Sequence, residues 1–593
     1  MKKSLTSLAV ILGIGLSASV SAAGFHPAPP AGHLGGVFVN PYGNAPLTAL
    51  VDLGSKRVSN VTVTVAGKGK NGVSISYPVG PKTINRHDGI PIFGLYTDYK
   101  NQVSIDFTLD GKKYTDKYEV LTSALENKYI DNRNITSMQE VKVKKVDKDF
   151  KDRLLLVNSH TMLFQGSDLH WAGVKGKNAG IFESTPALGS MTFDTAPLTY
   201  IIDTQGEIRW WLDQDATYNG RNIDVNKRGY LMGLRKDGRG NLSFVQGQHF
   251  GYLDLMGKIV DFKIPRGYQD LSHESVTMPN GNLLLRGAKT NYVNPQGDKV
   301  HTVRDHILEV DQQGNLLDVW DLNKILDPYR DALLKALDMG AVCVNVDLDH
   351  AGQAAGEMKI DAPYGDIPGV AAGRNWAHVN SISYDPKDDG IILSLRHQGI
   401  VKITRDKQVK WILTPSIGWK GELAKKLLKP VDAKGKAISC SEQGDCQGDF
   451  DFTYAQHTPW LSSKGTLTVF DNGDGRHYTQ PALPTQKYSR FVEYKIDENN
   501  MTVQQIWEYG KERGYEWYSP ITSNVEYVAD HNTIFGFGGS INLFEPGSRV
   551  TGKFNEIDYR TKEVKLEIDV LSDKAGQPHY RGLFIEPAKM FGR

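Results

Sequence analysis

The stretch YIIDTQGEIRW (residues 200–210) sets the pattern for most of this chain. Two apolar runs flank a turn that contains Asp203 and Gly206, residue types that tolerate turn backbone angles, so the stretch predicts a β-hairpin. The same pattern recurs five more times, at GYLDLMGKI (251–259), ILEVDQQGNL (307–316), VKITRDKQVKW (401–411), VEYKID (492–497, closing on Trp507) and NEIDY (555–559).

A second repeated segment lies between successive copies of the first. It has a polar start, a short strand, a Gly or Asn turn and an apolar strand, and it covers residues 221–235, 273–286, 378–396, 457–471 and 523–538, with a sixth copy expected near Tyr580. Two hairpins per repeat make a four-stranded sheet, and six radial sheets leave no long open edge. The sequence therefore predicts an all-β fold whose main unit, residues 151–593, is a six-bladed β-propeller. The alternative is an irregular stack of hairpins in a large sandwich.

The region before the repeats reads as a separate unit. Residues 61–65 and 103–109 alternate apolar and polar side chains, and Asp110-Gly111 marks a hairpin turn, so we expect a β-sandwich domain over residues 24–150. The charged run 141–153 is interpreted as a solvated connector. Inside the repeats, two inserts (322–375 and 417–455) carry short helix-like patterns at 329–337 and 422–428.

The N-terminus has the features of a secretory signal. Lys2 and Lys3 precede a short apolar run (residues 8–18) and small residues near position 22, so residues 1–23 are predicted to be a cleaved signal peptide, with a retained anchor as the alternative. No later apolar run is long enough for a spanning helix. The net charge of +1 is well mixed, which argues against nucleic acid or an anionic membrane surface as partner. We expect a protein of the bacterial periplasm.

Three cysteines fit this expectation. Cys440 and Cys446 lie close together in a polar loop, and an oxidising compartment favours a disulfide between them. The alternative, a pair of metal ligands, lacks a second Cys/His pair at zinc-finger spacing. Cys343 lies in an apolar run and is expected to be a buried free thiol.

Three of the second segments begin with histidine. These are His273, His378 and His457, and the first and last lie eight residues before Gly281 and Gly465. In a propeller the innermost strand of each blade lines the axial channel. The same register in three consecutive blades therefore predicts three imidazoles around one cavity. A single histidine in such a place would more often be structural.

Cations are expected beside these histidines. Arg235, Arg286 and Arg396 each end an apolar run, and a guanidinium fork binds the oxygens of a tetrahedral anion bidentately. Asn380, two residues after His378, offers an amide donor on the same side of its strand. Read in isolation, each arginine could equally be a solvated strand end.

Zinc is the alternative ligand for three histidines. The histidines lack the HxH or HExxH spacing of common metal sites, and no carboxylate occupies the equivalent position of a fourth blade. We therefore expect a site with no metal and no cofactor.

Four segments carry a resemblance to a known family: LSHES (271–275), WAHVNS (376–381), SLR (394–396) and AQHTP (455–459). With the signal, the β domain and the six hairpins, the chain resembles, over essentially its whole length, the bacterial periplasmic arylsulfate sulfotransferases that do not use the nucleotide sulfate donor. The resemblance implies transfer of a sulfuryl group from a phenolic ester to another phenol, through a covalent sulfohistidine and without metal.

The resemblance also implies roles for particular residues. His457 matches the nucleophile, and the sulfate-binding and acid/base positions match His273, His378, Asn380 and Arg396. Tyr580 matches a further tyrosine of the channel, and the family's short disulfide matches Cys440 and Cys446. The implied partners are an aryl sulfate donor, a phenolic acceptor, a second copy of the chain in a homodimer, and a periplasmic thiol-disulfide oxidase.

Two other functions stay open at this point. One is a non-catalytic propeller that binds a partner protein or glycan, and the other is a metal-dependent propeller hydrolase. The choice between His273 and His378 as proton donor is also open.

Overall fold

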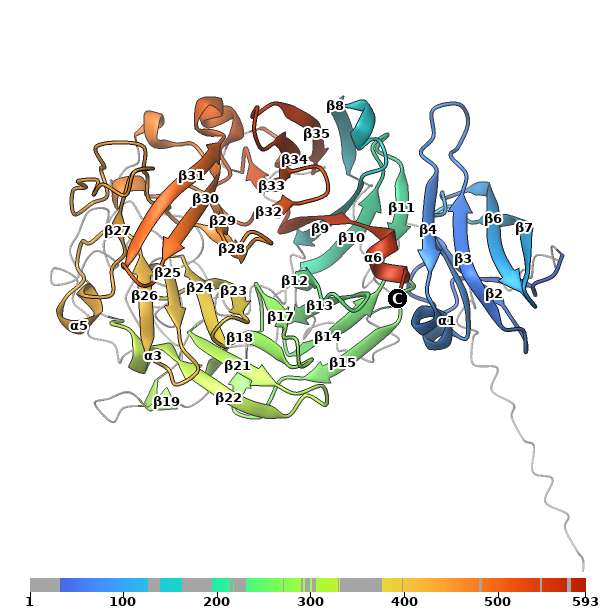
Figure 1. Ribbon diagram of the computed structural model, residues 1–593, viewed down its shortest axis with the longest axis horizontal. Coiled ribbons are helices and arrows are strands. Elements are labelled where there is room, and N and C mark those ends of the chain that lie inside the picture. Colours follow the sequence, from blue (N-terminus) through green and yellow to red (C-terminus); the bar gives the residue numbers. More distant parts are fainter. Residues whose placement is uncertain are drawn as a thin grey trace, which may run out of the picture.

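A computed structural model of the chain describes residues 32–125, 139–162, 195–213, 217, 231–269, 271–289, 292–293, 299–300, 305–328, 330, 376–396, 398–478, 483–543, 545, 547–572 and 578–593. Its regular structure is mostly strand, and Figure 1 shows two parts, a radial array of sheets and a smaller pair of sheets from the N-terminal residues. The predicted signal peptide (residues 1–23) and Cys343 lie outside the described residues.

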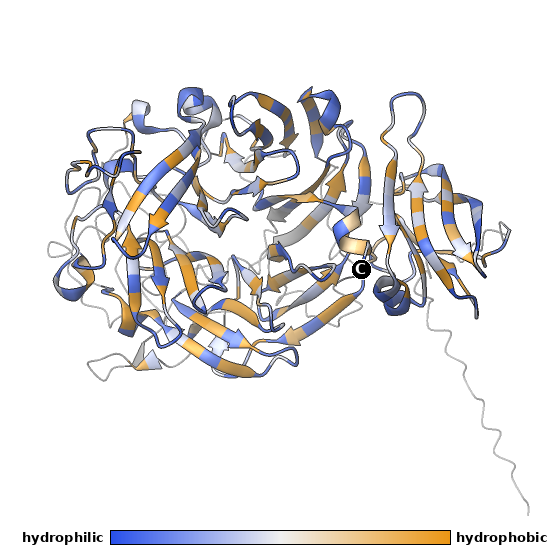
Figure 2. Ribbon diagram, in the orientation of Figure 1, coloured by the Kyte–Doolittle hydropathy of each residue, from blue (hydrophilic) through white to orange (hydrophobic). Residues whose placement is uncertain are grey.

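The smaller part is the predicted β-sandwich. One sheet contains β1 (Val37–Val39), β2 (Thr48–Asp52) and β5 (Gly89–Phe93), and the other contains β4 (Ile75–Val79), β3 (Val58–Val65), β6 (Tyr99–Leu109) and β7 (Lys112–Thr122). Every second side chain is buried from Asn101 to Phe107 in β6 and from Asp116 to Thr122 in β7, and Figure 2 shows the alternating hydropathy along these strands. The β6–β7 turn falls at Asp110 and Gly111, both with positive φ (49° and 76°), as the sequence predicts.

The larger part is a six-bladed propeller of antiparallel sheets, seen around a common centre in Figure 1. From the innermost strand outward, blade 1 contains β36 (Arg581–Ile585), β9 (Leu154–Met162), β10 (Thr195–Ile202) and β11 (Ile208–Trp211), and blade 2 contains β12 (Leu231–Lys236), β13 (Asn241–Gln246), β14 (His249–Asp254) and β15 (Ile259–Lys263). In the same order, blade 3 contains β17 (Ser275–Thr277), β18 (Leu283–Lys289), β21 (His306–Val310) and β22 (Leu316–Asp321), and blade 4 contains β23 (Val379–Asp385), β24 (Gly390–Leu395), β25 (Gly399–Ile403) and β26 (Val409–Leu413). Blade 5 contains β28 (His457–Leu461), β29 (Leu467–Asp471), β30 (Arg490–Asp497) and β31 (Thr502–Tyr509), and blade 6 contains β32 (Asn524–Val528), β33 (Thr533–Ile541), β34 (Thr551–Asp558) and β35 (Val564–Leu571).

Blade 1 closes the ring with strands from both ends of the propeller sequence. β36 pairs with β9, with Arg581 opposite Asn158. The segment near Tyr580, expected to be a hairpin, therefore supplies one strand, and its partner comes from the start of the repeats. All six predicted Asp/Gly hairpins form the two outer strands of a blade.

Two local expectations were wrong. The run interpreted as a connector forms β8 (Glu140–Val146), an edge strand on β35 with Val141 opposite Val570. It pairs because β35 would otherwise expose an unpaired edge. β8 thus joins blade 6 although it precedes the predicted domain boundary at residue 150, and the boundary itself stays a prediction.

In blade 2, the expected second segment (221–235) was placed too early along the chain. Its last residues belong to the innermost strand β12, and the turn follows at Gly238 and Gly240, which have φ of 67° and 88°. The strand that pairs back is β13, so Arg235 does not occupy the position of Arg286 and Arg396.

Among the residues that the structure describes, α-helices are few and short. They are α1 (Pro81–His87), α3 (Leu322–Ile325), α5 (Gly421–Ala424) and α6 (Pro587–Phe591). α5 is one turn that overlaps the start of the predicted 422–428 pattern, whereas the pattern at 329–337 lies outside the described residues except for Arg330. Among the described residues, no helix combines the length and apolar character that crossing a membrane requires.

The two parts share one hydrophobic core. Phe591 of α6 packs against Tyr77 of the sandwich, with ring centroids 5.0 Å apart. The buried guanidinium of Arg209 in β11 donates to the carbonyls of Gly94 and Val73. The sandwich is therefore fastened to blade 1 and to the C-terminal residues that follow β36.

Candidate active site

The three predicted histidines lie at the starts of neighbouring innermost strands. His457 is the first residue of β28, His378 immediately precedes β23, and His273 lies two residues before β17. The rings of His273 and His378 meet edge to face with centroids 5.3 Å apart. The Asn380 amide donates to the carbonyl of Gln456 at 2.8 Å, which joins the His378 strand to the residue before His457. The structure therefore brings these predicted residues together at one end of the channel.

The backbone at two of these positions is unusual. His273 and His378 have φ of 71° and 46°, in the left-handed region that non-glycine residues rarely adopt. Such conformations cost on the order of 1–3 kcal/mol and persist where surrounding contacts hold them. Both histidines are buried.

His457 is buried in its uncharged form. The side chain is 4% exposed, and its Nδ1 lies 2.7 Å from Oδ1 of Asn472. Burial lowers the pKa of His457 to about 3, and the guanidinium groups of Arg396 and Arg581 add to this lowering, while the Asn472 bond opposes it. At neutral pH the ring therefore has a lone pair available to attack an electrophile.

Arg396 follows β24 and is oriented by the neighbouring blades. Its guanidinium donates to the carbonyls of Ala455 (2.9 Å) and Pro520 (3.2 Å) and to the Asp474 carboxylate (2.9 Å). Burial raises the pKa of Asp474, and Arg396 opposes that shift. A cavity of about 30 Å³ lies beside Arg396 between blades 4 and 5, enough for one water.

Tyr580 and Arg286 both contact His273. The Tyr580 hydroxyl donates to the His273 carbonyl at 2.8 Å, and the two rings lie 5.8 Å apart. The Arg286 guanidinium lies 3.0 Å from Nδ1 of His273. A guanidinium can only donate, so Nδ1 is the acceptor and the hydrogen of the neutral His273 ring is on Nε2.

A buried carboxylate next to His273 pairs with a buried cation of blade 1. Glu274 is fully buried and accepts from the Arg581 guanidinium at 2.9 and 3.2 Å. The same carboxylate accepts from the Ser381 hydroxyl and the Trp460 indole. Residues of blades 1, 3, 4 and 5 thus meet in one polar cluster beside the histidines.

Arg235 belongs to this cluster rather than to the expected anion site. It lies 3.8 Å from Glu274, stacks on the Trp460 ring at 4.5 Å and donates to the Ile382 carbonyl. The prediction of an equivalent position with Arg286 and Arg396 was wrong because the innermost strand of blade 2 was misassigned.

Sequence reasoning missed Asn472, Asp474 and Glu274. One signal was available for Asn472, which follows the second strand of blade 5 as Arg396 follows the second strand of blade 4. Glu274 directly follows His273, but its role depends on side chains from other blades. Asp474 lies in a Gly-rich turn whose course local pattern does not predict.

The predicted disulfide is present. Cys440 and Cys446 are bonded, with an S–S distance of 2.09 Å. The loop that they close is tied to the site, because the Tyr454 hydroxyl donates to the Gln443 carbonyl at 2.8 Å and the next residue, Ala455, accepts from Arg396.

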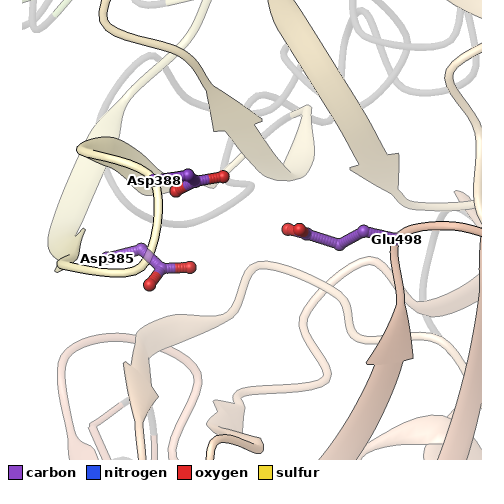
Figure 3. Close-up of side chains that lie close together, drawn as sticks. All are labelled: Asp385, Asp388 and Glu498. Atoms are coloured by element: carbon purple, nitrogen blue, oxygen red, sulfur yellow. The ribbon is translucent and has the colours of Figure 1, made fainter.

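Among the described residues, one group has the composition of a metal site, and it lies away from the histidines. Figure 3 shows Asp385, Asp388 and Glu498 converging from turns of blades 4 and 5. The ammonium of Lys402 lies between them, at 2.6, 2.9 and 2.7 Å from the three carboxylates. The group is therefore an ion-pair cluster in which the chain supplies its own cation.

Comparison with known proteins identifies the family. The arylsulfotransferase (ASST) family model matches residues 139–581, and the arylsulfotransferase Ig-like domain model matches residues 36–123. The arylsulfate sulfotransferase AssT of Escherichia coli O6:H1 (strain CFT073) is 64% identical over 593 residues, which cover all of this chain and 99% of that protein. The AssT of Lelliottia amnigena is 59% identical over the same span. The chain belongs to the arylsulfotransferase family.

Proposed function

We propose that the protein is an arylsulfate sulfotransferase that moves a sulfuryl group from a phenolic sulfate ester to another phenol, with His457 as the nucleophile. The observation that carries the proposal is a buried, neutral His457 whose pKa is lowered by burial and further by the charge of Arg396. It supports this reaction because an uncharged imidazole is a nucleophile and a guanidinium attracts the anionic ester.

In the first half-reaction the ring nitrogen of His457 forms a bond to sulfur while the bond from sulfur to the phenolic oxygen breaks. The electron pair of the broken bond leaves on the phenolic oxygen. By analogy with phosphoryl transfer, the transition state is loose and its charge lies on the peripheral and leaving oxygens. Positioning and charge stabilisation therefore provide most of the catalysis.

The proposal gives the other residues separate tasks. Arg396, with the second N–H of Asn380, holds sulfuryl oxygens, and His273 adds its Nε2–H as a donor of fixed direction. His378 is then the group that gives its proton to the departing phenolate. Tyr580, through its bond to the His273 carbonyl, keeps the His273 backbone in place.

The second half-reaction reverses the first with a new phenol. The acceptor gives its proton to His378, its oxygen forms the bond to sulfur, and the bond from His457 to sulfur breaks, with the electron pair returning to the ring. The cycle is ping-pong and needs no metal or cofactor. Phenols leave more readily than alcohols, so aryl esters are the expected donors.

Intact mass after brief treatment with a chromogenic aryl sulfate, quenched without acid, tests the proposal. The expected result is the gain of one sulfuryl group that maps to His457 and is absent from His457→Ala. The exposed His531→Ala serves as the control and should retain the adduct. Phenol release that is indifferent to acceptor would indicate a hydrolase. No turnover at all would indicate a binding propeller, and stoichiometric metal required for turnover would indicate a metal-dependent hydrolase.

We infer that the protein works in the periplasm after removal of residues 1–23, as a homodimer. The Cys440–Cys446 bond supports this location, since such bonds persist in oxidising compartments. A periplasmic thiol-disulfide oxidase would form it. Sedimentation of the mature chain tests the dimer, and N-terminal sequencing of exported protein tests the cleavage.

A further inference from the structure

We propose that Asn472 is a positioning residue that holds His457 in a single tautomer, with the hydrogen on Nδ1 and the reactive lone pair on Nε2. This inference rests on the proposed function, because it names the atom of His457 that would carry the sulfuryl group.

The Asn472 amide can have only one orientation. Its nitrogen donates to two main-chain carbonyls, Ser519 at 2.7 Å and Thr522 at 3.2 Å. Both partners are acceptors only, so the reversed amide would place an oxygen against two oxygens. The amide oxygen therefore faces Nδ1 of His457, 2.7 Å away.

This orientation decides the state of the imidazole. An amide oxygen accepts and cannot donate, so Nδ1 of His457 must carry the hydrogen. A neutral imidazole has one ring hydrogen, which leaves the lone pair on Nε2. The logic is that of an asparagine or aspartate that orients a catalytic histidine in hydrolases.

Asn472 is itself held on several sides. It is fully buried, and its main-chain carbonyl accepts from the Ser489 hydroxyl at 2.8 Å. The next residue, Gly473, has φ of 76° and donates to the Asp471 carboxylate and to the Tyr454 carbonyl. A Cβ at Gly473 would lie 2.1 Å from the Tyr488 carbonyl oxygen, so the turn requires glycine.

An amide suits both half-reactions better than a carboxylate would. When Nε2 of neutral His457 attacks sulfur, Nδ1 keeps its hydrogen and the ring becomes a sulfo-imidazolium. The Asn472 oxygen stabilises this positive charge through its hydrogen bond without removing the proton. When the acceptor takes the sulfuryl group, the electron pair returns to Nε2 and the ring leaves in its original neutral form. A carboxylate would stabilise the charged intermediate more strongly and slow its breakdown.

Asn472→Asp tests this reasoning through the balance of the two half-reactions. Rapid-quench release of phenol from donor alone measures sulfuryl transfer to the enzyme, and addition of phenol to the isolated adduct measures its breakdown. In Asn472→Asp we expect breakdown to slow by about tenfold or more while formation is retained, so that the adduct lives longer. Asn472→Leu, which offers no acceptor, should slow both steps.

Asn524→Asp is the matched control. Asn524 is a fully buried amide that also donates to one carbonyl and accepts from one backbone N–H, both of Gly582, and no hydrogen bond joins it to a histidine among the described residues. It can lower stability, but the ratio of the two half-reaction rates should stay as in the unchanged protein. If Asn472→Asp left that ratio unchanged, or altered it no more than Asn524→Asp does, the inference would be overturned.

Nitrogen-15 NMR of the full-length protein labelled at histidine separates this inference from the proposed function. The His457 signals, assigned by their loss in His457→Gln, should show a protonated Nδ1 and an unprotonated Nε2. A hydrogen on Nε2, or a charged ring at neutral pH, would overturn the tautomer assignment even if an adduct forms. If the spectrum were as expected but no aryl sulfate formed an adduct, the proposed function would be wrong, whereas the tautomer assignment would hold.

Discussion

The side chain of His457 couples the chemistry of the site to the stability of the fold. Because burial lowers its pKa from 6.5 to about 3, the folded state favours the neutral ring. The same depression keeps the nucleophile uncharged at all pH values well above about 3. Its protonation therefore should not limit turnover near neutrality.

That depressed pKa predicts a pH-dependent stability. Between about pH 6.5 and about pH 3 the unfolded chain binds a proton at His457 that the folded chain does not, so the free energy of unfolding falls as pH decreases through this window. His579, with a pKa lowered by burial to about 3, acts in the same direction. Urea unfolding of His457→Gln across this window should show a shallower decline than the unchanged protein or His531→Gln. An equally steep decline would contradict the expected role of His457.

Removing the charge of Glu274 should weaken the fold more than removing a surface carboxylate. Glu274→Gln keeps the shape and the contacts to Ser381 and Trp460 but leaves Arg581 without its buried counter-charge. We expect a loss of about 3–5 kcal/mol in the free energy of unfolding, measured with urea. Glu422→Gln, at an 84% exposed side chain paired with Lys425, should cost less than about 1 kcal/mol. Equal effects of the two substitutions would show that the buried pair contributes no more than an exposed one.

Among single residues, the sequence predicted those whose position repeats from blade to blade. It did not predict residues whose role depends on partners from neighbouring blades. His273, His378 and His457 each begin the second repeated segment of their blade, a position that is visible along the chain. Glu274 and Asn472 gain their importance from partners supplied by other blades, which one-dimensional pattern does not contain.

At the level of strands and turns, the ion-pair cluster of Asp385, Asp388 and Glu498 (Figure 3) joins the hairpin turns of blades 4 and 5. Lys402 in β25 lies inside the cluster with its side chain 1% exposed, whereas Lys410 in β26 contacts Asp388 and Glu498 with its side chain 32% exposed. The two lysines share carboxylate partners and differ in burial.

That difference predicts unequal costs of removal. Lys402→Met should lower the free energy of unfolding by at least about 2 kcal/mol, because three carboxylates are left close together around an apolar group. Lys410→Met should cost about 1 kcal/mol or less, since water screens the exposed pair. Chemical unfolding of both variants measures the difference. Equal costs would mean that burial of Lys402 adds nothing to the junction of the blades.

Element types were easier to predict than their partners. The six Asp/Gly hairpins were recognised because turn residues and alternating apolar residues are local signals. The edge strand β8 was misread because its charged outer face resembles a connector, and its pairing with β35 depends on an edge created more than 400 residues later. In blade 2 a turn was expected before residue 235, whereas the Gly-rich turn lies at 237–240, so the hairpin was predicted too early along the chain.

At the scale of the whole molecule, the N-terminal sandwich holds the strand that closes the ring. The Gly80 N–H donates to the Phe591 carbonyl at 2.9 Å, and the Thr83 N–H donates to the Arg593 carbonyl. Phe591 is 3% exposed and packs on Tyr77 and Phe93. Since β36 begins directly after Tyr580, these contacts also anchor the channel residues at the start of β36.

This arrangement predicts that Phe591→Ala weakens the propeller at blade 1, where β36 closes the circle of blades. The cavity should cost about 3–5 kcal/mol, and the loss should appear first as local opening of the C-terminal residues. Hydrogen exchange measured by mass spectrometry should accelerate in residues 578–593 and in β9, while the inner strands of blades 4 and 5 exchange as before. Leu121→Ala, at a side chain 64% exposed on the sandwich, should leave exchange in all of these segments unchanged.

Activity provides the second readout, because Tyr580 and Arg581 lie where β36 begins. As temperature rises, Phe591→Ala should lose transfer activity before its tryptophan fluorescence reports global unfolding, whereas in the unchanged protein the two losses coincide. Coincident losses in the variant, together with exchange that accelerates evenly over all six blades, would show that the sandwich stabilises the propeller as a whole and does not act on the closing strand.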